Sequence, residues 1–99
     1  MQPALNHFTT PKYWGFYHKL PSNVREVADN YFSLLKNNPK HPSLHLKKIG
    51  ELWSVRAGIH YRALGIETED KTKGILWIWI GSHAKYNQLI KRSQATNTS

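Results

Sequence analysis

Six consecutive apolar residues, Ile75–Ile80, limit the folds open to this chain. A strand or helix with one face in water carries polar residues at regular intervals, and this segment carries none. Six residues are also far fewer than the ~20 that a membrane-spanning helix needs. The segment therefore predicts a strand that is covered on both faces, inside a sheet.

Two helices are predicted before this strand. Thr10-Pro11 combines an N-cap residue with proline at the first helical position. Pro21-Ser22 ends the first helix near Leu20 and starts a second, which ends at Asn37-Asn38-Pro39. The apolar residues at helical spacing are Tyr13, Phe16, Tyr17 and Leu20, then Val24, Val27, Ala28, Tyr31 and Leu35. Because the break between them is short, we expect a helical hairpin.

The apolar spacing changes to strict alternation around Gly58. The alternating apolar residues are Trp53, Val55 and Ala57, then Ile59, Tyr61 and Ala63. They predict two antiparallel strands joined by a three-residue turn at 57–59. In that register Arg56 lies opposite His60, Val55 opposite Tyr61, and Ser54 opposite Arg62, so that one face is apolar and the other polar. Leu64 and Ile66 break the alternation, which predicts either a β-bulge or a change in the elements that cover the strand.

Further strands are expected at Leu5–Thr9 and Leu44–Ile49, with a charged hairpin tip at Glu67–Gly74. Ser82 would cap a short C-terminal helix. The predicted fold is α+β: a two-helix hairpin packed on one face of a twisted, mostly antiparallel sheet of four or five strands. We expect a single domain over residues 1–92 and a polar tail over 93–99.

Positive charge is concentrated in the predicted strands. The chain has 14 Lys and Arg against 6 Asp and Glu, a net charge of +8. Between Lys36 and Arg62 six Lys or Arg and three His face a single acid, Glu51. We expect this charge on the sheet face that the helices leave open, where it would bind a polyanion such as RNA. The alternative is a basic surface that only keeps the chain soluble.

Five side chains form the candidate catalytic site. Arg56, His60 and Arg62 share the polar face of the hairpin, His83 follows the buried strand, and Tyr86 lies one helical turn further on. Guanidinium groups bind phosphate in a fork, and histidine exchanges protons near neutral pH. A metal-free ribonuclease needs a base for the 2′-hydroxyl, cations for the transition state and an acid for the leaving 5′-oxygen. This set supplies all three.

Four of these residues also have a structural interpretation. His60 is an exposed hairpin residue in that view, His83 is a polar residue at a helix start, and both arginines pair with Glu51.

Other residues are candidate RNA contacts, and none predicts a cofactor. The candidate contacts are Lys47, Lys48, Lys85 and His45. His41 and His45 have helix-like spacing, but Pro42 between them and the lack of nearby acids argue against zinc. The absence of cysteine excludes disulfides, thiol nucleophiles and iron–sulfur centres. No cofactor or metal is expected.

Two segments, W-S-V-R-A-G-I-H-Y-R-A-L-G (53–65) and I-G-S-H-A-K-Y (80–86), resemble the RelE/ParE superfamily of toxins from bacterial type II toxin–antitoxin systems. The Leu20-Pro21 bend and H-P-S-L-H (41–45) also fit, and the resemblance covers about residues 5–90. It implies a RelE-like fold and an endoribonuclease that cleaves mRNA in the ribosomal A site. It also implies an inhibiting antitoxin.

The resemblance to the RelE and HigB branches maps catalytic roles onto Arg56, Arg62 and His83, with Tyr86 less closely matched. It maps RNA contacts onto Lys47 and Lys48. Some members carry clustered arginines after the last strand, where this chain has Ser82, His83 and Lys85. The assignment of acid and base therefore stays open.

Three functions remain after the sequence analysis. The first is a ribosome-dependent mRNA endoribonuclease, held in a hetero-oligomer by an antitoxin with an acidic or amphipathic segment. The second is a ParE-like poison of DNA gyrase, and the third a non-catalytic RNA-binding relative. Residues 1–10 lack the basic and apolar regions of a signal peptide, so we expect a cytoplasmic protein without a membrane partner.

Overall fold

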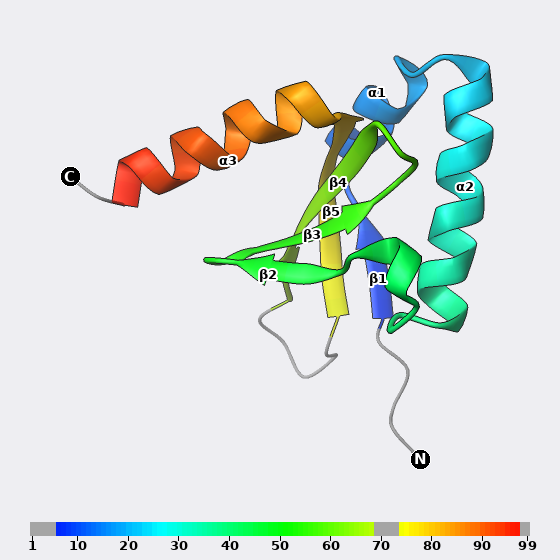
Figure 1. The fold of residues 1–99 in the computed structure, drawn as a ribbon, viewed down its shortest axis with the longest axis horizontal. Coiled ribbons are helices and arrows are strands. Elements are labelled where there is room, and N and C mark those ends of the chain that lie inside the picture. Colours follow the sequence, from blue (N-terminus) through cyan, green and yellow to red (C-terminus); the bar gives the residue numbers. More distant parts are fainter. Residues whose placement is uncertain (1–5, 69–73, 98–99) are drawn as a thin grey trace.

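The protein is an α+β sandwich, as predicted (Figure 1). The computed structural model describes residues 6–68 and 74–97, the last five through their backbone alone. In chain order the elements are β1 (Asn6–Thr9), α1 (Pro11–His18), α2 (Ser22–Asn37), a 3₁₀ turn (Pro42–Leu44), β2 (Lys47–Ile49), β3 (Leu52–Arg56), β4 (Tyr61–Glu67), β5 (Gly74–Ser82) and α3 (His83–Asn97). The predicted strand at 44–49 is thus divided between the 3₁₀ turn and β2.

The sheet has the order β1-β5-β4-β3-β2, in which only the β1–β5 pair is parallel. The predicted N-terminal strand is confirmed as β1. Because β5 lies between β1 and β4, the continuous apolar segment occupies an inner position. Part of the predicted hairpin tip between β4 and β5, including Glu69 and Asp70, lies outside the described residues.

The strand β5 is covered on both faces, as its sequence predicts. Ile75, Trp77 and Ile80 join the main core with α1 and α2. Trp79 joins a second cluster with Leu64 and Tyr86. A register shift between Leu64 and Gly65 allows this change of face, and it confirms the bulge expected there.

Local sequence signals explain where the helices begin. Thr10 Oγ1 accepts the backbone N–H of Tyr13 at 3.0 Å, so the predicted N-cap is confirmed. Pro21 precedes α2, which begins at Ser22 and runs to Asn37. The helical hairpin packs through Tyr13, Leu20, Ala28 and Leu35 on the main core. No helix in the described part of the chain is long and apolar enough to cross a membrane.

The predicted register of the β3–β4 hairpin is wrong by two residues. Arg56 pairs with Arg62 and Val55 with Ala63. Residues 57–60 connect the two strands; Ala57 N–H donates to Tyr61 C=O at 3.0 Å, and Gly58 adopts φ +126°. A slip of two keeps every side chain on its predicted face, since side chains alternate with a period of two.

The expectation of one bare sheet face is wrong in part. The helix α3 packs on the face opposite α2, where Tyr86, Leu89 and Ile90 contact the cluster of Leu64 and Trp79 (Figure 1). Its 15 residues exceed the predicted short helix, because it continues through Asn97 into the segment expected to be a tail. The apolar residues of β5 explain this cover, since one helical hairpin shields only one face.

We expect the stability of the fold to fall in mild acid because of His7 on β1. Its Nδ1 accepts Trp77 Nε1–H at 3.1 Å. Burial, and secondly the charge of Lys36, hold the pKa of His7 below the ordinary 6.5. The unfolded chain therefore takes up this proton first, so the contribution of neutral His7 is present above pH 6.5 and is lost as the pH falls.

Urea unfolding of the wild type and His7→Asn between pH 7.5 and 5 tests this expectation. The wild type should lose more unfolding free energy than the variant as the pH falls. An equal fall in unfolding free energy with pH in the two proteins would show that His7 does not contribute to the pH dependence of stability.

Candidate functional site

Residues from three strands and one helix meet at one end of the sheet. Arg56 on β3 pairs with Arg62 on β4, which pairs with Gly81 on β5. Two residues after Gly81, the backbone N–H of His83 donates to His60 C=O at 2.7 Å. The structure therefore brings together Arg56, Arg62, His60 and His83, which the sequence analysis had grouped.

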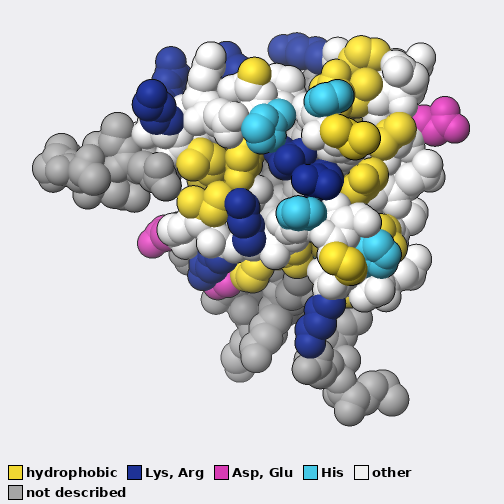
Figure 2. Space-filling view, viewed as in Figure 1, with side chains coloured by type: hydrophobic (Ala, Val, Ile, Leu, Met, Phe, Trp, Pro, Cys, Tyr) yellow, Lys and Arg dark blue, Asp and Glu magenta, His cyan; other side chains and the backbone are white. Residues whose placement is uncertain are grey.

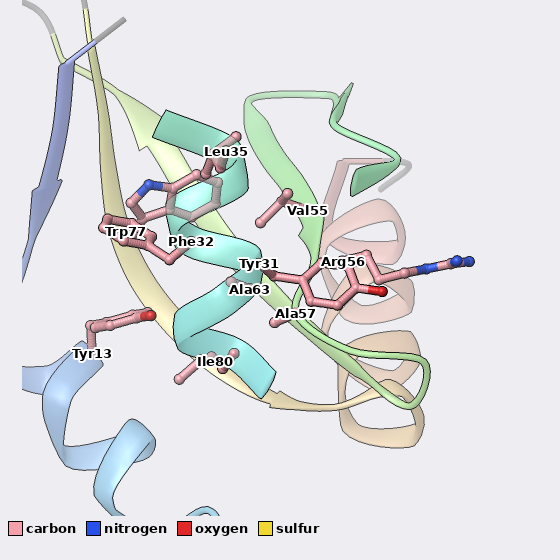
Figure 3. Close-up of a pocket in the computed structure, with 11 residues that line it drawn as sticks. Tyr13, Tyr31, Phe32, Leu35, Val55, Arg56, Ala57, Ala63, Trp77 and Ile80 are labelled. Carbon is pink, nitrogen blue, oxygen red and sulfur yellow. The ribbon is translucent and has the colours of Figure 1, made fainter. Parts of the chain in front are cut away.

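Arg56 and Arg62 are neighbouring cations without a carboxylate partner among the described residues. Burial and then the charge of Arg56 lower the pKa of Arg62 from its usual value. Arg56 Nε is buried without a hydrogen-bond partner in the described part of the chain, and its side chain leads away from the core (Figure 3). The one ion pair among the described residues joins Lys48 and Glu67, so the alternative pairing with Glu51 is not found. This cation pair is open to an anion.

Arg62 also holds the turn that carries His60. Its Nη1 donates to Tyr61 C=O at 2.8 Å, Gly58 C=O at 3.3 Å and Ile59 C=O at 3.4 Å. Sequence reasoning did not predict this role, because it depends on the longer turn. One end of the Arg62 guanidinium is thus used to shape the site.

His83 is exposed at the first position of α3. Ser82 Oγ accepts Lys85 N–H at 3.2 Å, as expected for the predicted cap. The His83 ring stacks on Tyr86, with centroids 5.9 Å apart and planes at 26°. His83 Nδ1 lies 3.4 Å from Asn87 Nδ2. Tyr86 and Asn87 together restrict the orientation of the His83 ring. The sequence analysis missed Asn87, because its contact with His83 depends on the helical spacing of four residues.

Tyr86 is buried instead of facing solvent. Its exposed fraction is 6%, and its hydroxyl accepts Ser54 Oγ–H at 2.9 Å. Ser54, itself 2% exposed, lies on the same face as Arg56 by strand alternation. The Tyr86 hydroxyl is thus buried and hydrogen-bonded to Ser54. Its position suits a residue that orients the His83 ring better than one that transfers a proton to the substrate.

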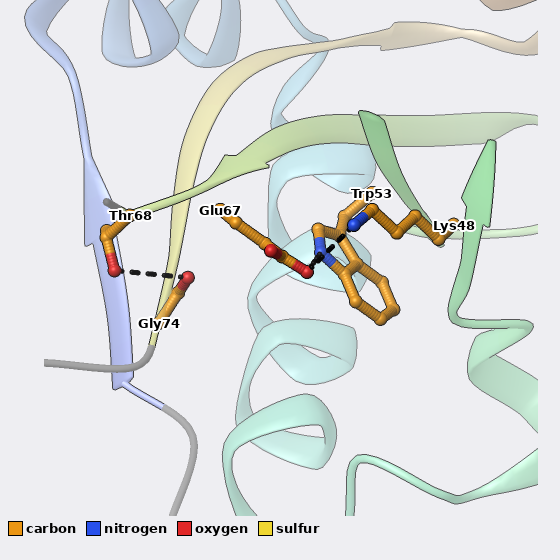
Figure 4. Close-up of polar contacts among 5 residues, drawn as sticks. All are labelled: Lys48, Trp53, Glu67, Thr68 and Gly74. Carbon is orange, nitrogen blue, oxygen red and sulfur yellow. Dashed lines mark hydrogen bonds and ion pairs between the residues drawn. The ribbon is translucent and has the colours of Figure 1, made fainter. Parts of the chain in front are cut away.

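The two adjacent lysines of β2 lie on opposite faces of the sheet. Lys47 pairs with Ser54, on the face of the arginines, whereas Lys48 pairs with Trp53 on the other face. Lys48 Nζ and Trp53 Nε1 both lie 3.1 Å from Glu67 Oε1 (Figure 4). These two donors, Lys48 first, lower the pKa of Glu67. Lys47 therefore remains available to the site, while Lys48 is engaged elsewhere.

The remaining predicted contacts lie at exposed positions around the site. His45 is an exposed residue in the left-handed region, φ 47°, just before β2. Lys85 is exposed in the first turn of α3. In Figure 2, Lys, Arg and His side chains gather near the middle of the visible face, and acidic side chains lie toward its edges. This distribution gives one face of the molecule a basic centre.

No metal cluster marks this site in the described part of the chain, and the cavity that Arg56 borders is small. No group of three or more His, Asp or Glu side chains close enough to hold a metal occurs among residues 6–68 and 74–92. The cavity between α2 and the sheet that Arg56 borders measures only about 20 Å³ (Figure 3). Small-molecule sites are typically about 300–1,000 Å³. The site is an open, charged surface that suits an extended ligand.

No protein-family model and no curated protein matches this chain. Solved structures do. A chain of the RelBE2 toxin–antitoxin complex from Mycobacterium tuberculosis has a TM-score of 0.61 and 18% identity, covering 82% of this chain and 100% of that one. The free E. coli RelE toxin with two arginines replaced by alanine has a TM-score of 0.59 and 18% identity, covering 91% and 98%. The YoeB/ParE toxin from Agrobacterium tumefaciens has a TM-score of 0.59 and 14% identity, covering 80% and 99%.

These matches are similarities of backbone structure at low sequence identity. They extend over most of this chain and nearly all of each solved structure. They agree with the element order and with the resemblance found in residues 53–65 and 80–86. The chain therefore has the fold of the RelE and YoeB/ParE toxins.

Proposed function

We propose that this chain is the toxin of a toxin–antitoxin system and an endoribonuclease that cleaves mRNA on the ribosome. The observation that carries the proposal is the cation pair of Arg56 and Arg62, which has no carboxylate partner within the described chain and lies beside His60 and His83. The fold of the chain is shared with toxins whose structures were solved in complex with antitoxins, and this likeness supports the proposal that the chain is a toxin.

The cleavage we propose needs only side chains of this site. One imidazole accepts the proton of the 2′-hydroxyl, whose oxygen forms a bond to phosphorus while the bond to the 5′-oxygen breaks. The other imidazole donates a proton to that leaving oxygen. The products are a 2′,3′-cyclic phosphate and a 5′-hydroxyl. His60 and His83 are the candidates for the two roles, in an order that the pH dependence of each variant would assign.

The arginines act on the charge that builds up at phosphorus. Arg56 directs its guanidinium away from the core and has no competing carboxylate in the part of the chain that the structure describes, so we expect it to bind the phosphate oxygens (Figure 3). Fixed cations of this kind stabilise a transition state more than a ground state, because the negative charge is greatest there. Lys47, on the same face, is placed to hold a neighbouring phosphate.

The same charge determines the partners that we propose. An antitoxin segment that inhibits this site should carry acidic residues over Arg56 and Arg62, because it must neutralise the charge that RNA would otherwise occupy. The ribosome would position the mRNA, since the cation pair lies on an open surface and the cavity that Arg56 borders measures only about 20 Å³.

The variant Arg56→Gln tests the catalytic proposal. We expect it to cleave ribosome-bound mRNA about 100- to 1,000-fold more slowly, the usual effect of removing one group that stabilises a charged transition state. Cleavage is measured by primer extension at saturating ribosome concentration. Arg25→Gln on α2 removes the same charge away from the site and should cleave at the wild-type rate.

Two results would overturn the proposal. Equal rates for Arg56→Gln and Arg25→Gln would remove Arg56 from the site. Absence of mRNA cleavage by the wild type, together with DNA breaks when purified gyrase and plasmid are supplied, would establish the gyrase-poison alternative. Loss of both activities in a folded protein would favour the non-catalytic relative.

A further inference from the structure

The exposed surface of α1 carries a tryptophan that the cleavage site does not use. Trp14 is 43% exposed. Its ring lies edge to face against Tyr13 and Tyr17, with centroids 5.2 and 5.1 Å away, and its Nε1 donates to Thr9 Oγ1 at 2.9 Å. These contacts hold the ring in one orientation, although much of it remains in water.

A glycine without a structural reason lies beside this ring. Gly15 is in the middle of α1, where glycine is a poor helix former. A Cβ at this position would meet nothing within 4 Å, so neither packing nor the backbone requires glycine. A residue that weakens a helix and leaves its backbone bare is expected where another molecule comes close.

Two lysines and a histidine surround Gly15. One helical turn from it, on the same face, lie Lys12, His18 and Lys19, all exposed. The sequence of α1 contains no acid. None of the three side chains forms an ion pair among the described residues, although Lys19 Nζ lies 5.7 Å from the centroid of the Phe16 ring. Asp29, which lines the same pocket as Trp14, accepts the Tyr17 hydroxyl at 2.8 and 3.0 Å. The surface therefore favours an anionic partner.

We propose that this surface, formed by Lys12, Trp14, Gly15, His18 and Lys19 and here named the α1 platform, binds RNA outside the cleavage site. One base stacks on Trp14 above Gly15, and Lys12 and Lys19 contact the adjoining phosphates. Aromatic rings within a basic surface are the usual means of holding single-stranded RNA. The proposal rests on the proposed function only in taking RNA as the ligand.

The position of α1 fits this role. It lies at the end of the sheet from which α3 begins (Figure 1). Its inner residue Phe16 packs on Trp79, in the same cluster as Tyr86. A strand of RNA on the platform would thus be held near the same end as Arg56 and His83. A membrane surface is less favoured, since Trp14 is the only large apolar residue among the five and an interfacial helix presents a broad apolar stripe.

Binding of a single-stranded RNA that carries 2′-O-methyl groups, and so cannot be cleaved, tests the platform. Fluorescence anisotropy should show a dissociation constant about 5- to 150-fold higher for Trp14→Ala, the range found when a stacked base loses its aromatic partner. Trp14→Phe should retain most of the affinity. Lys12→Gln should reduce the slope of log affinity against log salt by about 0.7, as for one lost phosphate contact on a single strand.

Gly15→Gln separates binding from stability. The substitution should raise the melting temperature by a few degrees, because glutamine forms helix better than glycine. It should nevertheless weaken RNA binding at least tenfold by covering the bare backbone.

The outcomes separate this proposal from the proposed function. Unchanged RNA affinity in folded Trp14→Ala and Gly15→Gln would overturn the platform, while cleavage dependent on Arg56 would still stand. Affinity that depends on both residues in a protein that cleaves nothing would support the platform and overturn the nuclease. Dependence on Trp14 for binding to phosphatidylserine vesicles, with none for RNA, would overturn the platform in favour of a membrane contact.

Discussion

Replacing His83 with alanine is expected to slow RNA cleavage by about 100- to 10,000-fold, the range that a positioned acid or base contributes. The imidazole is exposed at the start of α3, stacked on Tyr86 and next to the His60 turn. The fold should be unaffected, because alanine is the best helix former and the backbone N–H of residue 83 can still donate to His60 C=O. Single-turnover cleavage of ribosome-bound mRNA measures the loss, and circular dichroism checks the fold.

Two variants sharpen this test. His45→Ala makes the same substitution at an exposed histidine outside the His60–His83 pair. It should change the RNA concentration that gives half the maximal rate and leave the maximal rate itself intact. Asn87→Ala removes only the contact to His83 Nδ1 and should cost tenfold or less. A His83→Ala protein as active as His45→Ala would exclude His83 from the chemistry.

The sequence predicts the faces of the sheet well and the details of its turns poorly. Alternation from Trp53 to Ala63 places Arg56 and Arg62 on one face, because side-chain direction repeats every two residues along a strand. The exact register depends instead on the turn, and the geometry of 57–60 depends on Gly58 and on hydrogen bonds from Arg62. A three-residue turn was predicted because alternation cannot distinguish registers that differ by two.

The same limit explains what was missed in the candidate site. The Ser54–Tyr86 hydrogen bond joins residues 32 positions apart, so no local pattern reveals it. The site face was expected to be bare, yet Ile75–Ile80 already indicated that β5 needs cover on both sides. Applied to α3, that argument would have placed Tyr86 against the sheet.

Charge at the site also has a cost for the fold. Arg56 and Arg62 are adjacent cations, one with a buried and unpartnered Nε, and such an arrangement weakens a folded protein unless an anion binds. Proteins tolerate local destabilisation of this kind where a binding surface requires it. The stability that offsets it must come from the core around β5.

Trp77→Ala is expected to remove about 3–5 kcal/mol of unfolding free energy, the usual loss for a large aromatic side chain deleted from a core. Trp77 is 1% exposed, and its Nε1 donates to His7 on β1. Its backbone C=O also accepts Thr10 N–H, at the start of α1. The substitution thus opens a cavity where β1, β5 and the helices meet. Total stability for a domain of this size is about 5–15 kcal/mol, so the variant should be close to unfolding.

Trp14→Ala is the matched control, because it deletes the same side chain from an exposed position, where it is 43% exposed. The loss there should be about 1 kcal/mol, from one hydrogen bond and partial packing. Urea unfolding monitored by circular dichroism compares the two midpoints. Equal losses would mean that β5 is not the centre of the core. A large loss confined to Trp77 would show that the continuous apolar segment, and not the aromatic content of the chain, supports the charged site.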